Sequence, residues 1–266
     1  MSSIEQPTQN PIILWAHQRA VSSAFERTFV QRTDEFICFH EPFGEAIYFD
    51  EPLCERVHFN KPHSDQTPLN HFDSAFYIKE LLNKTVSRTY EQPFNESLKI
   101  SFTKVLDKIL LKDQSQNGND IKPKRVFVKE MAMFIKGHYG PNSDNFFSKN
   151  TMSKIKHTFL IRDPVKSVKS LYRTSMAINK DPTSPWYGYE FIPLSLGLSE
   201  LVELFNYVKD ELGQTPIVVD ADDLCNDSKK VLGKYCEMVN VDFKESMLTW
   251  EAGKIEGWGR YNGWHK

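Results

Sequence analysis

A short polar segment joins a buried apolar run to a helical stretch near the start of the sequence. The run Ile12–Trp15 leads through Arg19 into Ser22 and Ser23, where the helical stretch begins. A loop that feeds a helix N-terminus presents backbone N–H groups and the positive end of the helix dipole, which suits a phosphate or sulfate. Arg19 adds a permanent charge with a forked set of donors. We expect an anion site here; the alternative is that a serine only caps the helix and Arg19 is solvated.

A second segment, TFLIRDPVKSVKSLYR, also combines a cation with a hydroxyl at the end of a strand. The predicted strand ends at Arg162, Asp163 can cap the next helix, and Pro164 takes its first position. Ser170 lies two helical turns after Asp163 and faces the same side. Arg162 and Ser170 can therefore converge on one anion at the carboxyl edge of a sheet, where α/β folds bind ligands. The alternative is an arginine in a salt bridge and a serine on the surface.

Both segments resemble motifs of the sulfotransferase superfamily. Residues 18–23 (QRAVSS) are similar to the 5'-phosphosulfate loop, P-[KR]-S-G-[ST]-[ST], with Gln18, Ala20 and Val21 as departures. The second segment resembles the 3'-phosphate motif, R-[DN]-P-x-x-x-x-x-S. The resemblance implies 3'-phosphoadenosine-5'-phosphosulfate (PAPS) as the donor and 3',5'-adenosine bisphosphate (PAP) as the product. The residues that it assigns to the donor are Arg19, Ala20, Val21, Ser22, Ser23, Ala24, Arg162 and Ser170.

Two later segments resemble the family less closely. Pro216–Leu224 (PIVVDADDL) is similar to a strand that ends in a Y-E-D-L-like turn, with Ala221 in place of the tyrosine. Gly257–Lys266 (GWGRYNGWHK) stands where the family places a glycine-rich basic loop over the 3'-phosphate. There the resemblance implies Arg260 as a phosphate ligand and Trp258 as a platform for adenine.

The general base is the less clear part of the expected chemistry. Many members of the family carry a K-x-H triplet at the end of a central strand, where this chain has Lys129-Glu130-Met131. A branch resembling the bacterial trehalose sulfotransferase uses a glutamate just after the second strand, and Glu41 stands there, in the segment HEPF. A partly desolvated carboxylate at a strand end can have a raised pKa that suits a base. We expect Glu41 to be the base, with Arg19 stabilising the phosphosulfate. The alternative is that HEPF is a structural turn, and the reserve bases are His40, His17 and Glu130.

Short β-rich runs alternate with helical stretches, which predicts an α/β fold around a mostly parallel sheet. The expected strands are Ile12–Trp15, Phe36–Phe39, Arg125–Lys129, Thr158–Ile161 and Pro216–Asp220. The expected helices are Ser22–Gln31, Asp73–Asn83, Glu96–Leu111, Pro164–Met176, Ser199–Leu212 and Ser228–Val239. The family resemblance implies three layers, with helices flanking the central sheet, in a P-loop-like sulfotransferase fold.

Length and composition fit one domain over residues 1–266. Residues 1–10 are expected to be disordered or extended, and the aromatic, Pro/Gly-containing segment 179–197 is a candidate lid over the acceptor. The formal charge of −2 offers no global basic field for nucleic acid or an anionic membrane. No signal-peptide pattern occurs, and no apolar run approaches the roughly 20 residues that span a bilayer, so we expect a cytoplasmic protein. The four cysteines show no zinc-ligand spacing, and no metal is expected.

The resemblance therefore implies sulfuryl transfer from PAPS to a hydroxyl or amine of a small-molecule metabolite, for example in natural-product tailoring. A different class of function stays open, because the K-x-H triplet and the loop glycine are missing: a non-catalytic module that only binds PAP or PAPS. A P-loop kinase is disfavoured, because the pattern G-x-x-x-x-G-K-[ST] is absent. The acceptor and the oligomeric state are left open.

Overall fold

The computed structural model describes residues 9–49, 96–110, 124–141, 146–178 and 196–250, together with Ile255 and Trp258. Within this part of the chain, five strands form one all-parallel sheet in the order β2-β3-β1-β4-β5. The strands are β1 (Ile12–Ala16), β2 (Phe36–His40), β3 (Arg125–Met131), β4 (Lys156–Ile161) and β5 (Ile217–Asp220). Each includes nearly all of a run predicted from the sequence.

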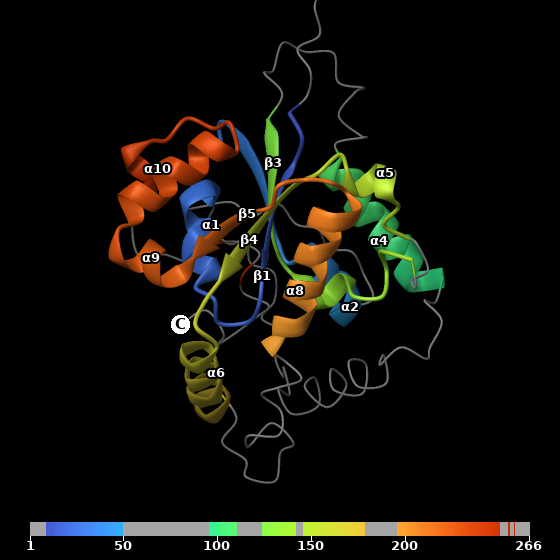
Figure 1. Cartoon of the computed structure of the whole chain (residues 1–266), viewed down its shortest axis with the longest axis horizontal. Helices are drawn as coiled ribbons and strands as arrows, with labels where there is room; N and C mark the ends of the chain where they lie inside the picture. Colours follow the sequence, from blue (N-terminus) through green and yellow to red (C-terminus); the bar gives the residue numbers. More distant parts are fainter. Residues whose placement is uncertain are drawn as a thin grey trace, which may run out of the picture.

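Helices cover both faces of the sheet, as Figure 1 shows. One face carries α1 (Ser22–Val30), α9 (Ala221–Asn226) and α10 (Ser228–Met238). The other carries α2 (Pro42–Phe49), α4 (Glu96–Ile109), α5 (Lys149–Met152) and α8 (Leu198–Asn206). The chain therefore has the predicted three-layer α/β fold, and α6 (Pro164–Ile178) extends from one end of the sheet. Shorter turns complete the list: η2 (Ala132–Ile135), the π-helical η3 (Tyr207–Glu211) and η4 (Glu245–Leu248).

Coverage on both faces explains why β1 (IILWA) and most of β2 (FICFH) are unbroken apolar runs rather than alternating ones. All five residues of β1, at the centre of the sheet, are buried. On the α1 face, the ring of Phe29 stacks on that of Phe127, with centroids 4.0 Å apart, and Phe25 meets Tyr235 of α10 edge to face at 4.8 Å. On the opposite face, Phe159 of β4 packs against Phe205 of α8 at 5.4 Å.

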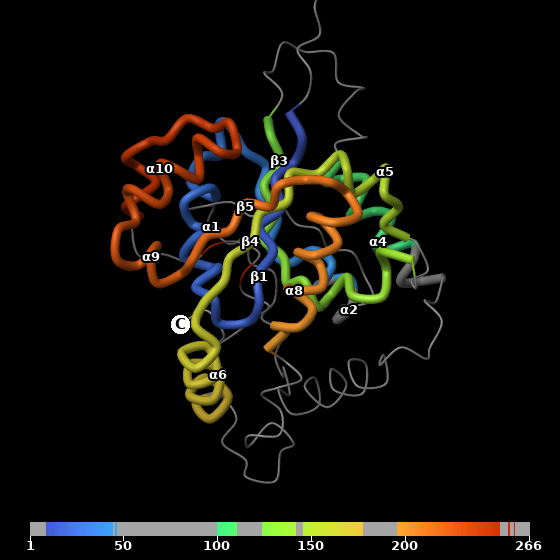
Figure 2. The backbone as a smooth tube through the Cα atoms, viewed as in Figure 1, coloured from blue at the N-terminus to red at the C-terminus, as the bar shows by residue number. Residues whose placement is uncertain are grey.

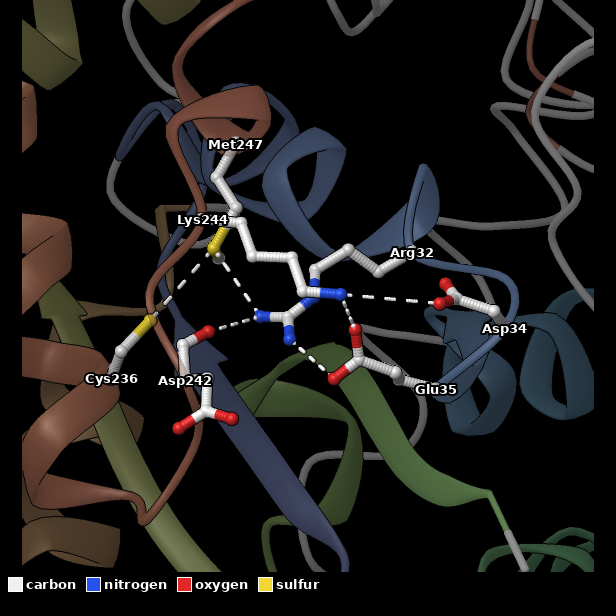
Figure 3. Close-up of polar contacts among 7 residues, drawn as sticks. All are labelled: Arg32, Asp34, Glu35, Cys236, Asp242, Lys244 and Met247. Carbon is white, nitrogen blue, oxygen red and sulfur yellow. Dashed lines mark hydrogen bonds and ion pairs between the residues drawn. The ribbon is translucent and has the colours of Figure 1, made fainter. Parts of the chain in front are cut away.

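An arginine fastens the end of α1 to the segment that follows α10 (Figure 3). The buried guanidinium of Arg32 donates to the carbonyl oxygen of Asp242 over 2.8 Å and to Sδ of Met247 over 3.4 Å. It also pairs with Glu35 at 2.5 Å, and Glu35 accepts in turn from Lys244. A guanidinium can bridge several acceptors at once because its donors point outward in a fixed fork. These contacts of Arg32 and Glu35 hold the C-terminal part of the chain against the end of α1, the helix that begins at the predicted anion loop.

Some predicted elements differ in extent, and others were missed. The helix predicted over Ser199–Leu212 is α8 continued by the π-helical turn η3, whereas α2 and α9 were not predicted as helices. The predicted helix Asp73–Asn83 and the predicted loop Asn60–Asn70 lie outside the described residues, as do most of the predicted loops Asp113–Lys124 and Asn179–Gly197. Among the described helices, none is long and apolar enough to cross a membrane.

Candidate active site

The carboxyl ends of all five strands lie at one edge of the sheet, because the strands are parallel. Ala16 of β1 stands level with Met131 of β3 and Leu160 of β4. The segments that follow these strands therefore start side by side, and the loop after β1 and the start of α6 lie at the same end of the sheet (Figure 2). This is the edge at which open α/β sheets bind ligands.

The loop between β1 and α1 has an unusual backbone. Arg19 and Val21 have φ angles of 64° and 66°, both in the left-handed region, and the residue between them, Ala20, is fully buried. A β-branched residue rarely adopts this conformation, which costs on the order of 1–3 kcal/mol. Val21 occupies the position at which the family pattern has glycine. Its backbone adopts the left-handed conformation that glycine favours, although the residue is valine.

The serines belong to the first turn of α1 rather than to its cap. The helix begins at Ser22, and the N-cap residue, Val21, has no side-chain capping bond. Ala24 and Phe25 donate their backbone N–H groups to the carbonyl oxygen of Val21 over 3.1 and 3.2 Å. The helix N-terminus therefore opens toward the loop with two hydroxyls beside it, an arrangement that suits an anion.

The two predicted anion motifs meet in space. Nε of Arg19 donates to Oγ of Ser170 on α6 over 3.1 Å, across 151 positions of sequence. Nη1 of Arg162 donates to the carbonyl oxygen of Arg19 over 2.9 Å. Asp163 caps α6 as predicted, because its Oδ1 accepts from the backbone N–H of Val165 over 2.7 Å. The structure thus brings Arg19, Arg162 and Ser170 together, and no ion pair joins Arg162 to any described residue.

Positive charge gathers at this meeting point. The pKa of Arg19 is lowered by burial and by the neighbouring charges of Arg162 and Arg173. Nε of Arg162 is buried and has no hydrogen-bond partner among the described residues. Cations held close together against their mutual repulsion, with a buried donor still to satisfy, favour a bound anion.

His17 is fixed in one neutral form beneath the loop. Its Nε2 accepts the backbone N–H of Arg162 over 3.2 Å, and its Nδ1 lies 2.9 Å from the carbonyl oxygen of Gln18. Since a carbonyl can only accept, the proton resides on Nδ1. Burial lowers the pKa of His17, and the charge of Arg162 adds to this effect. Both ring nitrogens are therefore occupied by backbone groups, and the bond to Nε2 joins the end of β1 to the end of β4.

Glu41, the predicted base, follows β2 directly and is buried next to a lysine. It has a φ of 44°, and its backbone N–H donates to the carbonyl oxygen of Lys129 over 2.8 Å. Nζ of the fully buried Lys129 donates to Oε1 of Glu41. Lys129 occupies the first place of the triplet that corresponds to K-x-H, and the sequence alone gave it no role.

Glu130, a reserve base, holds the start of α2. Its Oε2 accepts the backbone N–H of Phe43 over 2.7 Å, and its Oε1 accepts that of Met131 over 2.8 Å. Burial, followed by the negative charge of Glu41, raises the pKa of Glu130 well above its ordinary value. Both oxygens thus satisfy backbone donors, as expected of a carboxyl that caps a helix.

Sequence reasoning also missed Glu26, which lies 2.6 Å from Nδ1 of His40 and is fully buried. A signal was present, because Glu26 falls beside the core positions Phe25 and Phe29 of an amphipathic helix. A carboxylate there must be paired or hydrogen-bonded.

The remaining predicted residues lie in different settings. Trp258 is buried, with its ring centroid 4.9 Å from that of His40 and 5.5 Å from Cζ of Arg27. Arg260 and most of the candidate lid lie outside the described residues, although the backbone N–H of Gln18 donates to the carbonyl oxygen of Leu196, where that segment ends. Ala221 is buried as the first residue of α9, which Asp220 caps. No cluster of metal-binding side chains occurs among the described residues.

Comparisons with known proteins found one family match, two partial relatives and several distantly similar structures. The sulfotransferase domain family matches residues 205–265. Two proteins of Arabidopsis thaliana, branched-chain-amino-acid aminotransferase-like proteins 1 and 2, are 33% identical over 113 residues. The matched part is 42% of this chain and 18% of each plant protein, so the chain spans less than a fifth of the relatives that it matches.

Similar solved structures include the sulfotransferase domain from the curacin biosynthetic pathway, at 12% identity and a TM-score of 0.47, covering 94% of this chain and 80% of that domain. The sulfotransferase domain of the Synechococcus PCC 7002 olefin synthase follows at 14% identity and 0.44, covering 96% and 82%. A sulfotransferase from Alicyclobacillus acidocaldarius follows at 12% and 0.42, covering 92% and 87%. The match to the sulfotransferase domain family covers residues 205–265, in the C-terminal part of the chain.

Proposed function

We propose that this protein transfers a sulfuryl group from PAPS to a hydroxyl or amine of a small-molecule metabolite. The observation that carries the proposal is the direct contact of the two anion motifs, through the 3.1 Å bond from Arg19 to Ser170 and the 2.9 Å bond from Arg162 to the backbone of Arg19. A donor with a phosphosulfate at one end of adenosine and a phosphate at the other needs two anion sites at a fixed separation. Contact between the two motifs supports one shared site for such a donor.

The residues fit this donor by their chemistry. The start of α1 offers backbone N–H groups, the helix dipole and the hydroxyls of Ser22 and Ser23 to the phosphosulfate. Arg162 and Ser170 take the 3'-phosphate, and the buried Nε of Arg162 gains a partner there. An anion bound among Arg19, Arg162 and Arg173 offsets the repulsion between their like charges.

The proposed mechanism follows from the position at which negative charge develops during sulfuryl transfer. The acceptor oxygen forms a bond to sulfur while the bond from sulfur to the bridging phosphate oxygen breaks, and PAP leaves with the electron pair of that bond. As in phosphoryl transfer, negative charge accumulates on the leaving oxygen. Arg19 and the first N–H groups of α1 stabilise this charge with donors that are already in place.

Glu41 takes the proton of an acceptor hydroxyl in this proposal. The hydrogen bond from Nζ of Lys129 to Oε1 holds the carboxyl group of Glu41 in place at the end of β2, where a base would act. Glu130 and His17 are less suited to the role, because backbone groups engage both of their polar atoms. For a neutral amine acceptor the same carboxylate takes a proton after the attack.

The test is acceptor-dependent turnover. Purified protein is incubated with PAPS and a library of hydroxyl- and amine-bearing metabolites, and both PAP and the sulfated product are measured by mass spectrometry. We expect PAP and one sulfated compound to appear in equal amounts. Tight PAP binding without turnover on any acceptor would instead support the non-catalytic module, and the absence of both binding and turnover would contradict the proposal.

A further inference from the structure

A buried carboxyl–imidazole pair, Glu26 and His40, lies next to Glu41. Oε2 of Glu26 on α1 is 2.6 Å from Nδ1 of His40, the last residue of β2. The two side chains are 0% and 1% exposed. A carboxyl oxygen and an imidazole nitrogen approach this closely when a proton lies between them, since otherwise two lone pairs would face each other. The pair therefore holds one proton.

His40 stands between Glu26 and the proposed base. Its Nε2 lies 3.9 Å from Oε1 of Glu41, and Trp258 packs near its ring. Glu41, the next residue, has the left-handed φ of 44°. A non-glycine residue keeps such a conformation only where its surroundings over-determine it. The bond from Glu26 anchors the residue immediately before this strained position.

The helix that carries Glu26 also carries the donor loop. Ser22 begins α1, and Glu26 follows it by four residues, which is a rise of about 6 Å along a regular helix. One rigid turn therefore separates the proposed phosphosulfate site from the carboxyl group that holds His40. The relative position of donor and base depends on this turn and on the Glu26–His40 bond.

We propose that Glu26 is a positioning residue that fixes Glu41 relative to the donor loop by anchoring His40. This inference rests on the proposed role of Glu41 as the base. Its electrostatics are consistent, because burial raises the pKa of Glu26 well above its ordinary value, an effect that Lys129 opposes and Glu41 reinforces.

Two substitutions separate anchoring from charge. Glu26→Gln keeps an oxygen that can accept from Nδ1 of His40, whereas Glu26→Leu removes the acceptor and keeps a similar volume. We expect Glu26→Gln to retain most of kcat, and Glu26→Leu to lose at least about tenfold, within the roughly 10²–10⁴-fold that a positioned base supplies. PAP should raise the melting temperature of both variants as it does for the wild type. Glu237→Leu, at an exposed glutamate of α10, is the matched control and should leave kcat unchanged.

The deciding measurement repeats Glu26→Leu in a Glu41→Gln background. If Glu26 acts through Glu41, Glu26→Leu lowers kcat little or not at all in the Glu41→Gln background, because the base that Glu26 positions is already absent. A loss of equal size in both backgrounds overturns the proposal, as does a normal kcat for Glu26→Leu beside an impaired Glu41→Gln. A normal kcat for Glu41→Gln alone refutes the base assignment and this inference together. Should Glu26→Leu not fold, His40→Gln serves in the same cycle, with the same two outcomes.

Discussion

Arg19 donates a hydrogen bond from Nε to Oγ of Ser170 over 3.1 Å and so joins the loop after β1 to the middle of α6. The bond orients the guanidinium of Arg19 at the edge of the sheet where the anion is proposed to bind. It also couples the proposed phosphosulfate site to the proposed 3'-phosphate site. Substitution of either residue should therefore affect the binding of both ends of the donor.

Arg19→Ala should lower kcat by roughly 10²–10³, the scale for loss of one pre-set donor to a transition-state oxygen. Arg19→Lys keeps the charge and should retain appreciable activity, because the family pattern accepts either residue. Initial rates of PAP formation at saturating PAPS measure both effects. Lys209→Ala, at an exposed lysine far along the chain on η3, is the control. A fully active Arg19→Ala protein would refute the role assigned to this side chain.

The strained backbone at Val21 gives a prediction for stability. Val21→Gly removes a left-handed penalty of about 1–3 kcal/mol, which offsets the extra unfolded-state entropy of glycine, about 0.5–1 kcal/mol, and some lost packing. We expect the free energy of unfolding to stay level or to rise by about 1 kcal/mol. Ala24→Gly, inside α1, should lower it by roughly 0.5–1 kcal/mol. Urea denaturation measures both, and a larger loss for Val21→Gly than for Ala24→Gly would show that Val21 is not strained.

The buried His157 should make the fold sensitive to acid. Its Nδ1 accepts from the indole of Trp15 over 2.9 Å, its Nε2 lies 2.9 Å from the carbonyl oxygen of Met152, and burial lowers its pKa from 6.5 to about 4. Below pH 6.5 His157 binds a proton in the unfolded chain, whereas in the folded chain it does so only near pH 4. Stability is therefore lost as the pH falls from 6.5 to 4, by about 3 kcal/mol in all.

His157→Gln can keep both hydrogen bonds and cannot be protonated, so its melting temperature should fall less over this pH range than that of the wild type. His138→Gln, at a half-buried histidine outside the sheet, is the control and should follow the wild type. Parallel curves for the wild type and His157→Gln would contradict the prediction.

The role of Glu41 is tested by replacing it with glutamine, which keeps the shape but cannot take a proton. Glu41→Gln should leave PAP affinity nearly unchanged and lower kcat by about 10²–10⁴. An acceptor with a more acidic hydroxyl should recover part of the loss, because it needs less help to ionise. His40→Ala, His17→Ala and Glu130→Gln test the reserve bases. An inactive protein among these three, beside a normal Glu41→Gln, would place the base elsewhere.

The strands and the two anion motifs could be predicted because their signals are local. An unbroken apolar run indicates a strand covered on both faces, and β1 and β4 are of this kind. The helix α2 was not predicted from the sequence, and Gly44 falls inside it. A Cβ at Gly44 would lie 2.5 Å from the ring of Phe134, so this glycine permits close packing rather than breaking the helix.

The surroundings of Glu41 could not be predicted, because they depend on which strands become neighbours. Lys129 is 88 positions from Glu41 and reaches it only because β3 pairs with β2, with His40 opposite Lys129 in the register. Glu26 is 14 positions from His40, on a helix that crosses the same strands. No spacing rule in the sequence expresses either contact.

The central claim is that the two motifs form one site for a nucleotide with phosphates at both the 3' and 5' positions. Its most direct test is the melting temperature in the presence of PAP, AMP or ATP at equal concentrations. A ligand that binds only the folded state stabilises it by about 2.7 kcal/mol at 100 times its Kd, so the shifts rank the affinities. We predict a far larger shift with PAP, which Arg162→Ala largely abolishes and which Lys166→Ala, at an exposed lysine on the helix that follows Arg162, leaves unchanged. Equal shifts from PAP and AMP in the wild type would contradict the account.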